Sequence, residues 1–420
     1  MVDERTGEDA DVAVIGAGIV GLASAVFLGR AGARVTLLDA LPPGGGASFG
    51  NAGLLSIDAC VPVSLPGMLR QVPRWLSDPL GPLAVDARYV VKALPWLLGW
   101  LRAGRMDNVI ASSYALRALH KPGLEQYREL LGPSHFHDLI RTSGQVHVWE
   151  GAAVSSAERI SRELWARHGV VTETLGPHEL NQLIPEISPA VSRAVLFPNN
   201  GHTVNPQRLL DTLAMLLREA GGRVRHERVM KILPQEGAGF RVLTNNGDHR
   251  FAKVVVAGGA WSKRLLAPLG VRLPLETERG YHAMVRNPSF SLRIPVLHKT
   301  KAFGATPMEG GLRFAGTVEI AGLDIPMNER RAEAVLSQGR ALFPSLRGED
   351  VSIWMGYRPS LPDSVPVIDE VAARRGLFIA CGHGHTGMTA GAVTGRLVSQ
   401  LVLGAEPMID RRPYRLARFH

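Results

Sequence analysis

The sequence predicts an α/β protein of two interwoven domains, and three stretches of the chain lead to this prediction. Residues 11–39 read as strand, glycine-rich turn, helix and strand, which is how a doubly wound nucleotide-binding domain begins. Residues 271–355 hold short strand-like runs separated by turns, as in an antiparallel sheet. Residues 376–403 return to a strand, a glycine loop and a helix. The prediction is therefore a Rossmann-like domain interwoven with an α+β domain built on an antiparallel sheet.

A chain of 420 residues is long enough for two domains, and no internal repeat or low-complexity linker separates them. We therefore expect each domain to be assembled from separate segments. The nucleotide-binding domain is predicted to comprise residues 1–60, 200–268 and 352–420. The second domain, which would bind the substrate, is predicted to comprise residues 61–199 and 269–351.

The first motif is GAGIVG, which follows the β-branched run at residues 11–15 and opens a helix. Gly16 permits a tight turn, Gly18 lets the backbone approach a pyrophosphate, and Gly21 permits close packing of helix on strand. Asp39 lies 18 residues after Gly21, at the end of the next strand, where a carboxylate can accept hydrogen bonds from a ribose. The motif predicts dinucleotide binding, with the phosphates at the helix N-terminus.

A second glycine-rich segment, ASFGNAG at residues 47–53, follows the second strand at once. A structural loop alone would not need so many small residues. The segment could wrap an extended FAD and reach its flavin end, so it favours FAD over NAD as the dinucleotide.

Residues 65–139 read mostly as helices interrupted by proline. Within them the apolar run YVVKALPWLLGWL at residues 89–101 has 13 residues, which is too few to span a bilayer. We expect it to be a buried helix pair, or, because tryptophans and arginines lie near it, a surface that docks on a membrane. A strand at residues 144–150 and a helix at residues 152–168 follow.

The centre of the chain is predicted to contain a helix at residues 205–220 and a strand at residues 222–232. The clearest hairpin lies at residues 239–257, where FRVL, the turn NNGD and RFAKVVVA follow one another. Asn246–Gly247 is its predicted turn pair.

Near the C-terminus a strand at residues 376–380 leads through the loop CGHGHTG into a helix at residues 388–403. A helix N-terminus on a glycine loop favours anions. Reduced flavin carries negative charge near N1 and O2, which such an end would stabilise. Four small residues would let this helix lie close to the first one: Ala390, Gly391, Thr394 and Gly395.

The composition excludes several classes of protein. Glycine accounts for 46 residues, about 11% against the usual ~7%, and we attribute much of the excess to the cofactor. The formal net charge is +9, but the arginines are scattered, with one small cluster at residues 411–418. No basic stripe with interleaved aromatic residues is present, so we expect no nucleic-acid partner.

The cysteines and the N-terminus indicate the compartment. Cys60 and Cys381 lie far apart and predict neither a disulfide framework nor a metal site. Residues 1–11 are acidic, which is the wrong charge for the start of a secretory signal. We therefore expect a cytoplasmic protein, with peripheral contact at the inner face of the cytoplasmic membrane as the alternative.

These motifs resemble the D-amino acid oxidase superfamily of flavoproteins, and in particular its bacterial D-amino acid dehydrogenase branch. The segments that carry the resemblance, besides GAGIVG with Asp39, are ASFGNAG (47–53), TVNPQRLLDTL (203–213), VVVAGGAWS (254–262), ERGYH (278–282), GYRPSLPDSVPVI (356–368) and GHGHTGMT (382–389). ERGYH differs from the KGY-type segment of the alanine-directed members. It is similar to that of relatives acting on cyclic imino acids such as hydroxy-D-proline.

The resemblance implies roles for individual residues. Arg358 would hold the substrate carboxylate, which suits a guanidinium fork that stays charged at all working pH values. Tyr281 would be a second contact through its hydroxyl, with a packed aromatic ring as the alternative. His383 and His385 would hydrogen-bond flavin or substrate, or would only cap the helix. Arg358, Tyr281 and His383 are the predicted catalytic residues.

The cofactor is expected to be FAD, bound without a covalent link, because no histidine lies between Asp39 and Gly53. The predicted cofactor contacts are Gly16, Gly18, Ile19, Val20, Gly21, Asp39, Ala47, Ser48, Asn51, Ala52, Gly53, Leu54, Val229, Ala257, Gly258, Trp261, Gly382, Gly384, His385, Thr386, Gly387, Met388 and Thr389.

The implied reaction is oxidation of a D-amino or cyclic imino acid by hydride transfer from Cα to flavin N5. The electrons would pass to a quinone or another respiratory acceptor. One alternative is a glycine- or sarcosine-type oxidase that uses oxygen. Another is a flavin-binding subunit that works only inside a larger amine dehydrogenase complex.

Overall fold

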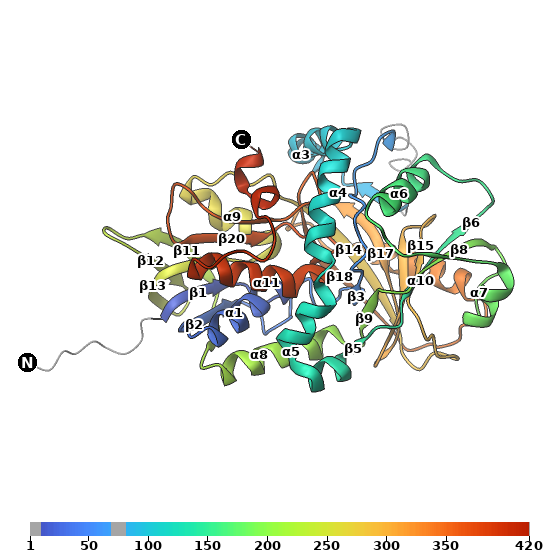
Figure 1. Ribbon diagram of the computed structural model, residues 1–420, viewed down its shortest axis with the longest axis horizontal. Helices are drawn as coiled ribbons and strands as arrows, with labels where there is room; N and C mark the ends of the chain where they lie inside the picture. Colours follow the sequence, from blue (N-terminus) through green and yellow to red (C-terminus); the bar gives the residue numbers. More distant parts are fainter. Residues whose placement is uncertain (1–9, 69–80, 420) are drawn as a thin grey trace, which may run out of the picture.

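The computed structural model describes residues 10–68 and 81–419, and residues 69–80 of the predicted helical region lie outside the described part (Figure 1). Two lobes lie side by side along the long axis of the molecule, each built on its own sheet (Figure 1). The predicted α/β architecture of two interwoven domains is therefore confirmed, because both lobes take strands from distant parts of the chain.

The first sheet carries the nucleotide-binding motif. Its strands are β1 (Ala10–Ile15), β2 (Val35–Asp39), β10 (Arg223–His226), β11 (Val229–Pro234), β12 (Phe240–Thr244), β13 (Gly247–Val256), β19 (Val367–Glu370) and β20 (Leu377–Cys381). The order is β10-β2-β1-β13-β12-β11, and β20 lies beside β13 and β19. Strands β10, β2, β1, β13 and β20 are parallel to one another. Their carboxyl ends therefore meet at one edge, where ligands of such sheets bind.

Helices cover this sheet on the face toward which Val12 and Val14 point. They are α1 (Ile19–Arg30), α8 (Pro206–Glu219) and α11 (Gly387–Leu403). Ala13 and Ile15 point to the opposite face and pack with Leu266 of the short helix α9 (Ser262–Leu266). Strand β1 is thus buried on both sides over residues 12–15, which explains why these residues are all apolar rather than alternating.

Two local predictions in this sheet are wrong. The predicted strand at residues 222–232 is two strands, β10 and β11, which lie at opposite ends of the strand order; between them the Arg228 N–H donates to Asn245 Oδ1 over 2.7 Å. In the hairpin, Thr244 pairs with Gly247, so Asn245 and Asn246 are the turn residues. Gly247 is instead the first residue of β13 and has a φ of +133°.

The second sheet has nine strands in the described part of the chain. They are β4 (Leu83–Val85), β6 (Gln145–Glu150), β7 (Glu173–Leu175), β8 (Val191–Phe197), β14 (Glu276–Val285), β15 (Val296–His298), β16 (Phe303–Met308), β17 (Gly311–Ile320) and β18 (Val351–Ser360). Strands β14 to β18 pair antiparallel, whereas β15 pairs with β6 in parallel. Strand β18 extends this sheet past residue 352, where the sequence places the domain boundary.

A small third sheet joins the two lobes. It consists of β3 (Leu54–Leu55), β5 (Ile140–Arg141) and β9 (Gly201–Thr203). The helices outside the first sheet are α3 (Val90–Ala103), α4 (Met106–His120), α5 (Gly123–Leu139), α6 (Ser156–Arg167), α7 (Pro177–Leu183) and α10 (Glu329–Leu342). Helix α6 begins later than the sequence predicts, because Ser155 caps it by accepting from Glu158 N.

The apolar run at residues 89–101 forms the single helix α3 and not a helix pair, since Pro95 lies inside it without ending it. Trp96 and Trp100 are buried, whereas Val91 is 82% exposed and Leu94 and Leu98 are about half exposed. None of the described helices has the length and apolar character that crossing a membrane requires.

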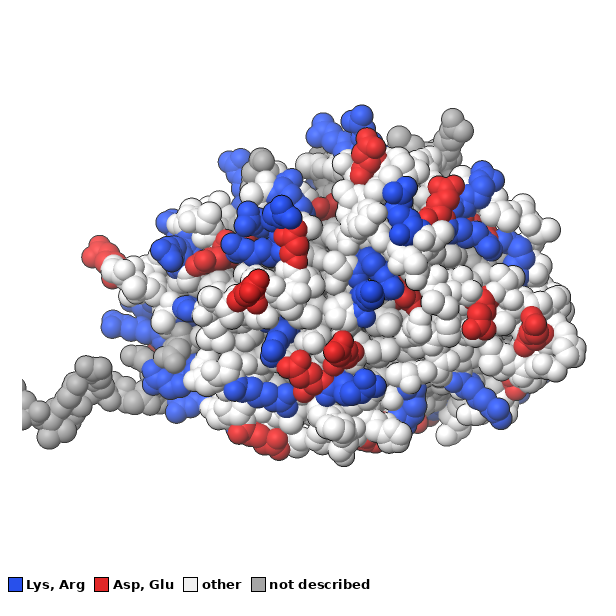
Figure 2. Space-filling view, in the orientation of Figure 1, with Lys and Arg blue, Asp and Glu red and all other residues white. Residues whose placement is uncertain are grey.

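Helices α1 and α11 pack closely, as the small residues of α11 predict. A Cβ on Gly395 would lie 2.6 Å from the carbonyl carbon of Ala23, and one on Gly391 would lie 2.6 Å from Ile19 Cγ1. Basic and acidic side chains are interspersed over the face shown in Figure 2, with no continuous stripe of one sign.

Candidate active site and cofactor cavity

A cavity of about 1070 Å³ runs between the two large sheets. One end is lined by Gly16, Asp39 and Val229, and the other by Arg358 and Lys299. Ligand pockets commonly measure 300–1,000 Å³, so the cavity has room for a large ligand and a small one together. Both lobes contribute to its walls.

The glycine turn after β1 forms the first part of the wall. Gly16 has a φ of +112°, and a Cβ there would lie 2.4 Å from the carbonyl oxygen of Ala257. Gly18 is the N-cap of α1 and offers no side-chain cap; Ser48 Oγ accepts from the first N–H, that of Ile19, and the next N–H groups, those of Val20 and Gly21, are open to an anion. These two features fit the pyrophosphate of a dinucleotide, which needs close backbone approach and free donors.

Asp39 holds this turn in place. Its Oδ2 accepts from Ala17 N over 2.6 Å, and its Oδ1 accepts from Leu41 N over 2.9 Å. Each carboxylate oxygen retains a further lone pair, and Asp39 lines the cavity. The residue can therefore bind a ribose hydroxyl while it fixes the glycine turn.

We expect Asp39→Ala to weaken FAD binding about tenfold to a hundredfold, because a hydrogen bond to a charged group contributes roughly 1.5–3 kcal/mol. Titration of the apoprotein with FAD, followed by flavin fluorescence, measures the dissociation constant. Asp39→Asn keeps one acceptor oxygen, so its dissociation constant for FAD should lie between those of Asp39→Ala and the unchanged protein. An unchanged constant in Asp39→Ala would mean that the residue only caps the strand.

The second glycine-rich segment lies against α1 and the second sheet. Ser48 Oγ accepts from Ile19 N over 3.1 Å, and Asn51 Oδ1 accepts from Gly53 N over 2.8 Å. Arg313 of β17 donates to the carbonyl oxygens of Phe49 and Asn51 over 3.1 and 2.6 Å. This buried arginine, whose pKa burial lowers to about 10, was not predicted, because nothing in its local sequence marks it.

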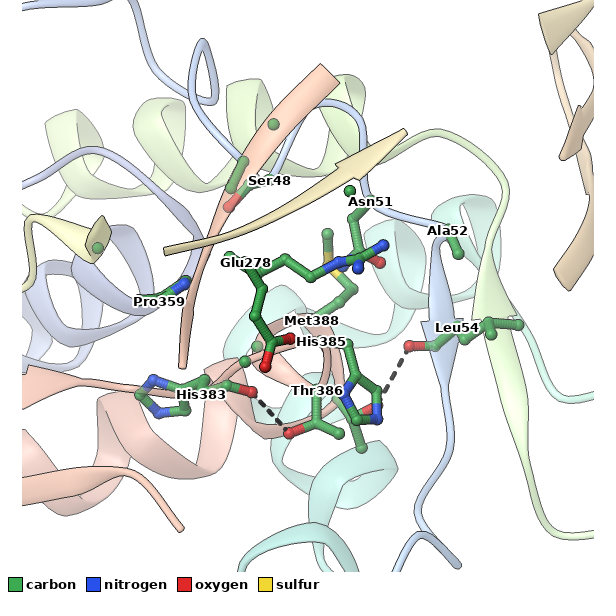
Figure 3. A pocket seen from close by; sticks show the side chains of 18 of the residues that line it. Ser48, Asn51, Ala52, Leu54, Glu278, Pro359, His383, His385, Thr386 and Met388 are labelled. Atoms are coloured by element: carbon green, nitrogen blue, oxygen red, sulfur yellow. Dashed lines mark hydrogen bonds between the residues drawn. The ribbon is translucent and has the colours of Figure 1, made fainter. Parts of the chain in front are cut away.

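The N-terminus of α11 closes the cavity on the side of the second predicted anion site (Figure 3). Its N-cap, Thr386, makes no side-chain cap and donates its hydroxyl to the carbonyl oxygen of His383 over 3.0 Å. Thr389 Oγ1 donates to the carbonyl oxygen of Leu54 over 3.2 Å, which ties the helix to β3. The amides of the first turn therefore remain open to negative charge, as a bound flavin requires.

Three of the predicted cofactor contacts do not line this cavity: Gly21, Gly53 and Gly382. A Cβ on Gly21 would lie 1.8 Å from the carbonyl oxygen of Gly16, and Gly53 and Gly382 have φ values of +72° and +92°. These three glycines therefore determine the path of the backbone behind the residues that line the cavity. The other predicted contacts all line the cavity.

Arg358, on β18, lines the cavity. Its Nη1 donates to the carbonyl oxygen of Thr317 over 2.9 Å. The side chain occupies the space above Gly280, where a Cβ would lie 2.2 Å from Nη2. Burial lowers the pKa of Arg358, and the charge of Glu278 opposes this shift.

Glu278 is a cavity residue that sequence reasoning missed. It pairs with Arg358 across β14 and β18, and it lines the same cavity (Figure 3). Burial raises the pKa of its carboxyl, whereas Arg358 and Ser360 lower it. The motif ERGYH held a signal for the position of Glu278. Residues two apart on a strand point to the same face, and Gly280, two residues after Glu278, lies beneath Arg358.

The predicted role of Tyr281 is corrected by the same alternation. Tyr281 points to the face opposite Glu278, where its hydroxyl donates to Glu319 Oε2 over 2.5 Å. The guanidinium of Arg331 on α10 lies 5.8 Å from the centre of its ring. The hydroxyl is thus already bound inside the second lobe, which favours the packed-ring alternative, although Tyr281 is among the residues that line the cavity.

His383 and His385 have different surroundings. His383 is buried, and its Nε2 lies 2.9 Å from Thr394 Oγ1 on α11. Burial lowers its pKa to about 3. His385 extends toward the cavity, where burial, Arg358 and Lys299 lower its pKa to about 4. Both histidines line the cavity, but His383 also contacts α11 through Thr394, whereas His385 is the more exposed of the two.

The His383 imidazole predicts a pH effect on stability. Because the unfolded chain binds a proton below about pH 6.5 and the folded chain does not until about pH 3, stability is lost as the pH falls through this window. The loss amounts to about 2 kcal/mol at pH 5. We expect His383→Gln to show a smaller difference in urea unfolding between pH 7.5 and pH 5. The exposed His137→Gln serves as the control, and an unchanged difference in His383→Gln would contradict the assignment.

The outer part of the cavity was also missed by sequence reasoning. It is lined by Cys60, Met68, His147, Trp149, Trp165, Phe197 and Lys299. These residues come from separate elements and share no motif, so only the pairing of β6, β8 and β15 brings them together.

Comparison with known proteins agrees with this geometry. The family model described as FAD dependent oxidoreductase (DAO) matches residues 11–401. A curated D-amino-acid oxidase from Bradyrhizobium diazoefficiens is 37% identical over 419 residues, which cover 98% of this chain and 99% of the relative.

Solved structures show the same fold at lower identity. Glycine oxidase from Geobacillus kaustophilus matches with a TM-score of 0.74 and 24% identity, over 98% of this chain and 99% of that one. L-proline dehydrogenase from P. horikoshii matches with a TM-score of 0.75 and 20% identity, over 98% of each chain. The match over nearly the whole length, the glycine turn with Asp39 and the open helix ends at the cavity lead to one conclusion: the chain belongs to the DAO family of FAD-dependent oxidoreductases.

Proposed function

We propose that the protein oxidises a D-amino or cyclic imino acid. The observation that carries the proposal is the half-buried Arg358 in the wall of a cavity that also holds the glycine turn and Asp39, which fit FAD. The carboxylate of an amino acid is planar and accepts two parallel hydrogen bonds, which matches the fork of a guanidinium. The 37% identical D-amino-acid oxidase supports the same class of substrate.

Bound FAD supplies the two-electron oxidant. Arg358 binds the substrate carboxylate and thereby fixes the position of Cα, on which the rate depends. Glu278, directly across the strand pair, accepts a hydrogen bond or a proton from the substrate amine. The amides at the start of α11 stabilise negative charge on their side of the cavity. The substrate leaves as an imine, which water hydrolyses, or as a cyclic imine when the substrate is a ring.

The proposed electron acceptor is a quinone, in a dehydrogenase that contacts the membrane. The support is the exposed apolar face of α3, formed by Val91, Leu94 and Leu98, with Lys92 and Arg102 on the same helix. Such a face suits the surface of an anionic bilayer. Vesicle flotation with the double variant Leu94→Gln, Leu98→Gln tests this part, and equal flotation of both proteins would contradict it.

The substrate experiment is a panel of D-, L- and N-methyl amino acids, D-proline and hydroxy-D-proline, assayed with an artificial dye acceptor in the presence and absence of air. We expect turnover with D-amino or cyclic imino acids and little peroxide. Peroxide formation under air would support the oxygen-using alternative. Turnover of glycine or sarcosine alone would show that the proposed substrate class is wrong.

We expect acid to release the flavin from the protein. Flavin that remained on the denatured chain would contradict noncovalent binding.

A further inference from the structure

Lys299 is a cation that faces the cavity without a partner. It follows β15 and lines the outer part of the cavity, where its side chain keeps accessible surface. Within the described part of the chain its ammonium makes no hydrogen bond and no ion pair. The carboxylate of Glu150, on the neighbouring strand β6, is bound by Lys301 over 2.6 Å and by His298 over 3.0 Å. Lys299 is thus left as a free charge in the wall.

The surroundings of this ammonium explain why a ligand would bind there. Lys299 is an exposed residue that lines the cavity, and desolvation by the surrounding protein lowers the pKa of its ammonium. A cation in such a place is costly unless an anion joins it. Because water within a cavity screens poorly, an anion that reaches Lys299 gains more than it would at the molecular surface.

A second polar group points to the same place. His147, which pairs with Leu297 across β6 and β15, lines the cavity, and its buried Nδ1 has no hydrogen-bond partner. Burial and the charge of Lys299 keep the pKa of His147 well below its usual value, so the ring is neutral. A neutral imidazole can donate one hydrogen bond to an anion beside the ammonium.

Aromatic rings surround this pair. The centre of the His147 ring lies 4.2 Å from that of Phe197 and 6.2 Å from that of Trp165. Trp149 completes the wall, with its ring centre 6.3 Å from that of His147. The space between Lys299 and the flavin end is therefore suited to a short hydrocarbon chain that carries an anionic tip.

Lys299 and Arg358 belong to one site. Both cations line the same cavity as His385, and both act on that imidazole by lowering its pKa. Among the described residues, Glu278 is paired with Arg358, whereas no carboxylate acts on Lys299. A ligand with one carboxylate at Arg358 would still leave Lys299 unpaired.

We propose that Lys299, with His147, binds a second carboxylate of the substrate, so that the preferred substrates are dicarboxylic D-amino or imino acids. The inference rests on the proposed function, because it assumes that Arg358 binds the first carboxylate. It names Lys299 as a residue that determines specificity and takes no part in the oxidation itself.

The test compares D-glutamate with D-glutamine, which has the same shape without the charge. For the unchanged holoenzyme we expect kcat/KM to be at least tenfold higher with D-glutamate. Lys299→Met should remove this preference by raising KM for D-glutamate while leaving D-glutamine nearly unaffected, and Lys299→Arg should keep it. Lys301→Met is the matched control, because Lys301 is bound to Glu150 and does not line the cavity.

A binding measurement separates this inference from the proposed function. Glutarate and butyrate are added to the flavin-loaded protein, and the change in flavin absorbance gives each dissociation constant. We expect glutarate to bind more tightly, and Lys299→Met to abolish the difference. Tighter glutarate binding through Lys299 without turnover of any amino acid would support the subsite and overturn the function. Turnover of neutral D-amino acids with equal binding of the two probes would overturn the subsite alone.

Discussion

Replacing Arg358 with alanine is expected to lower kcat/KM by roughly 10²- to 10³-fold while FAD stays bound. Removal of one partner from a buried, hydrogen-bonded charge pair costs about 2–5 kcal/mol. The variant would lose both the attraction for the substrate carboxylate and the orientation of Cα. Arg358→Lys keeps the charge but loses the planar fork, so kcat should fall as well as the affinity.

Steady-state kinetics on flavin-saturated variants measure this effect. A carboxylate-free amine is the matched substrate control, since its oxidation should depend little on Arg358. If Arg358→Ala kept both kinetic constants within about twofold, a difference of only ~0.4 kcal/mol, the proposal that Arg358 binds the substrate carboxylate would be wrong. Loss of stability or of flavin with near-normal kinetics would instead indicate a structural role beside Glu278.

The second large effect is expected at the crossing of α1 and α11. Gly395→Ala places a methyl group 2.6 Å from the backbone of Ala23, and backbone atoms cannot move aside as a flexible side chain can. We expect the free energy of unfolding to fall by roughly 1–3 kcal/mol. This loss should appear although alanine favours a helix over glycine by about 1 kcal/mol.

Urea unfolding of the apoprotein measures this loss, and FAD titration measures its consequence for the two helix ends at the cavity. Gly310→Ala is the control, because a Cβ at Gly310 would meet no heavy atom within 4 Å. Equal stability of Gly395→Ala and the unchanged protein would show that the helices can separate without cost.

The parts of the site that could be predicted from the sequence are those in which backbone N–H groups bind the ligand. The turn at residues 16–21 and the loop at residues 382–389 are recognisable because glycine spacing alone determines which N–H groups are free. Arg358 was recognisable because it lies inside a motif. Each of these depends on neighbours in the sequence.

The remaining parts depend on which strands pair. Glu278 meets Arg358 only because β14 and β18 are antiparallel in one register, and the same alternation puts the Tyr281 hydroxyl on Glu319, on the other face of the strand. A shift by one residue would exchange the two. Lys299 and His147 meet through a parallel pairing of distant strands, for which the sequence holds no local signal.

The way the first sheet is assembled has a consequence for how the protein is made. Strand β1, at residues 10–15, pairs with β13 at residues 247–256, and helix α11, at residues 387–403, covers α1. On the ribosome, α1 emerges well before α8 and α11, the two helices that cover it. Its apolar surface therefore stays exposed in the growing chain, which favours chaperone binding during translation. The FAD-binding site is complete only when nearly the whole chain has emerged, so cofactor loading is a post-translational step.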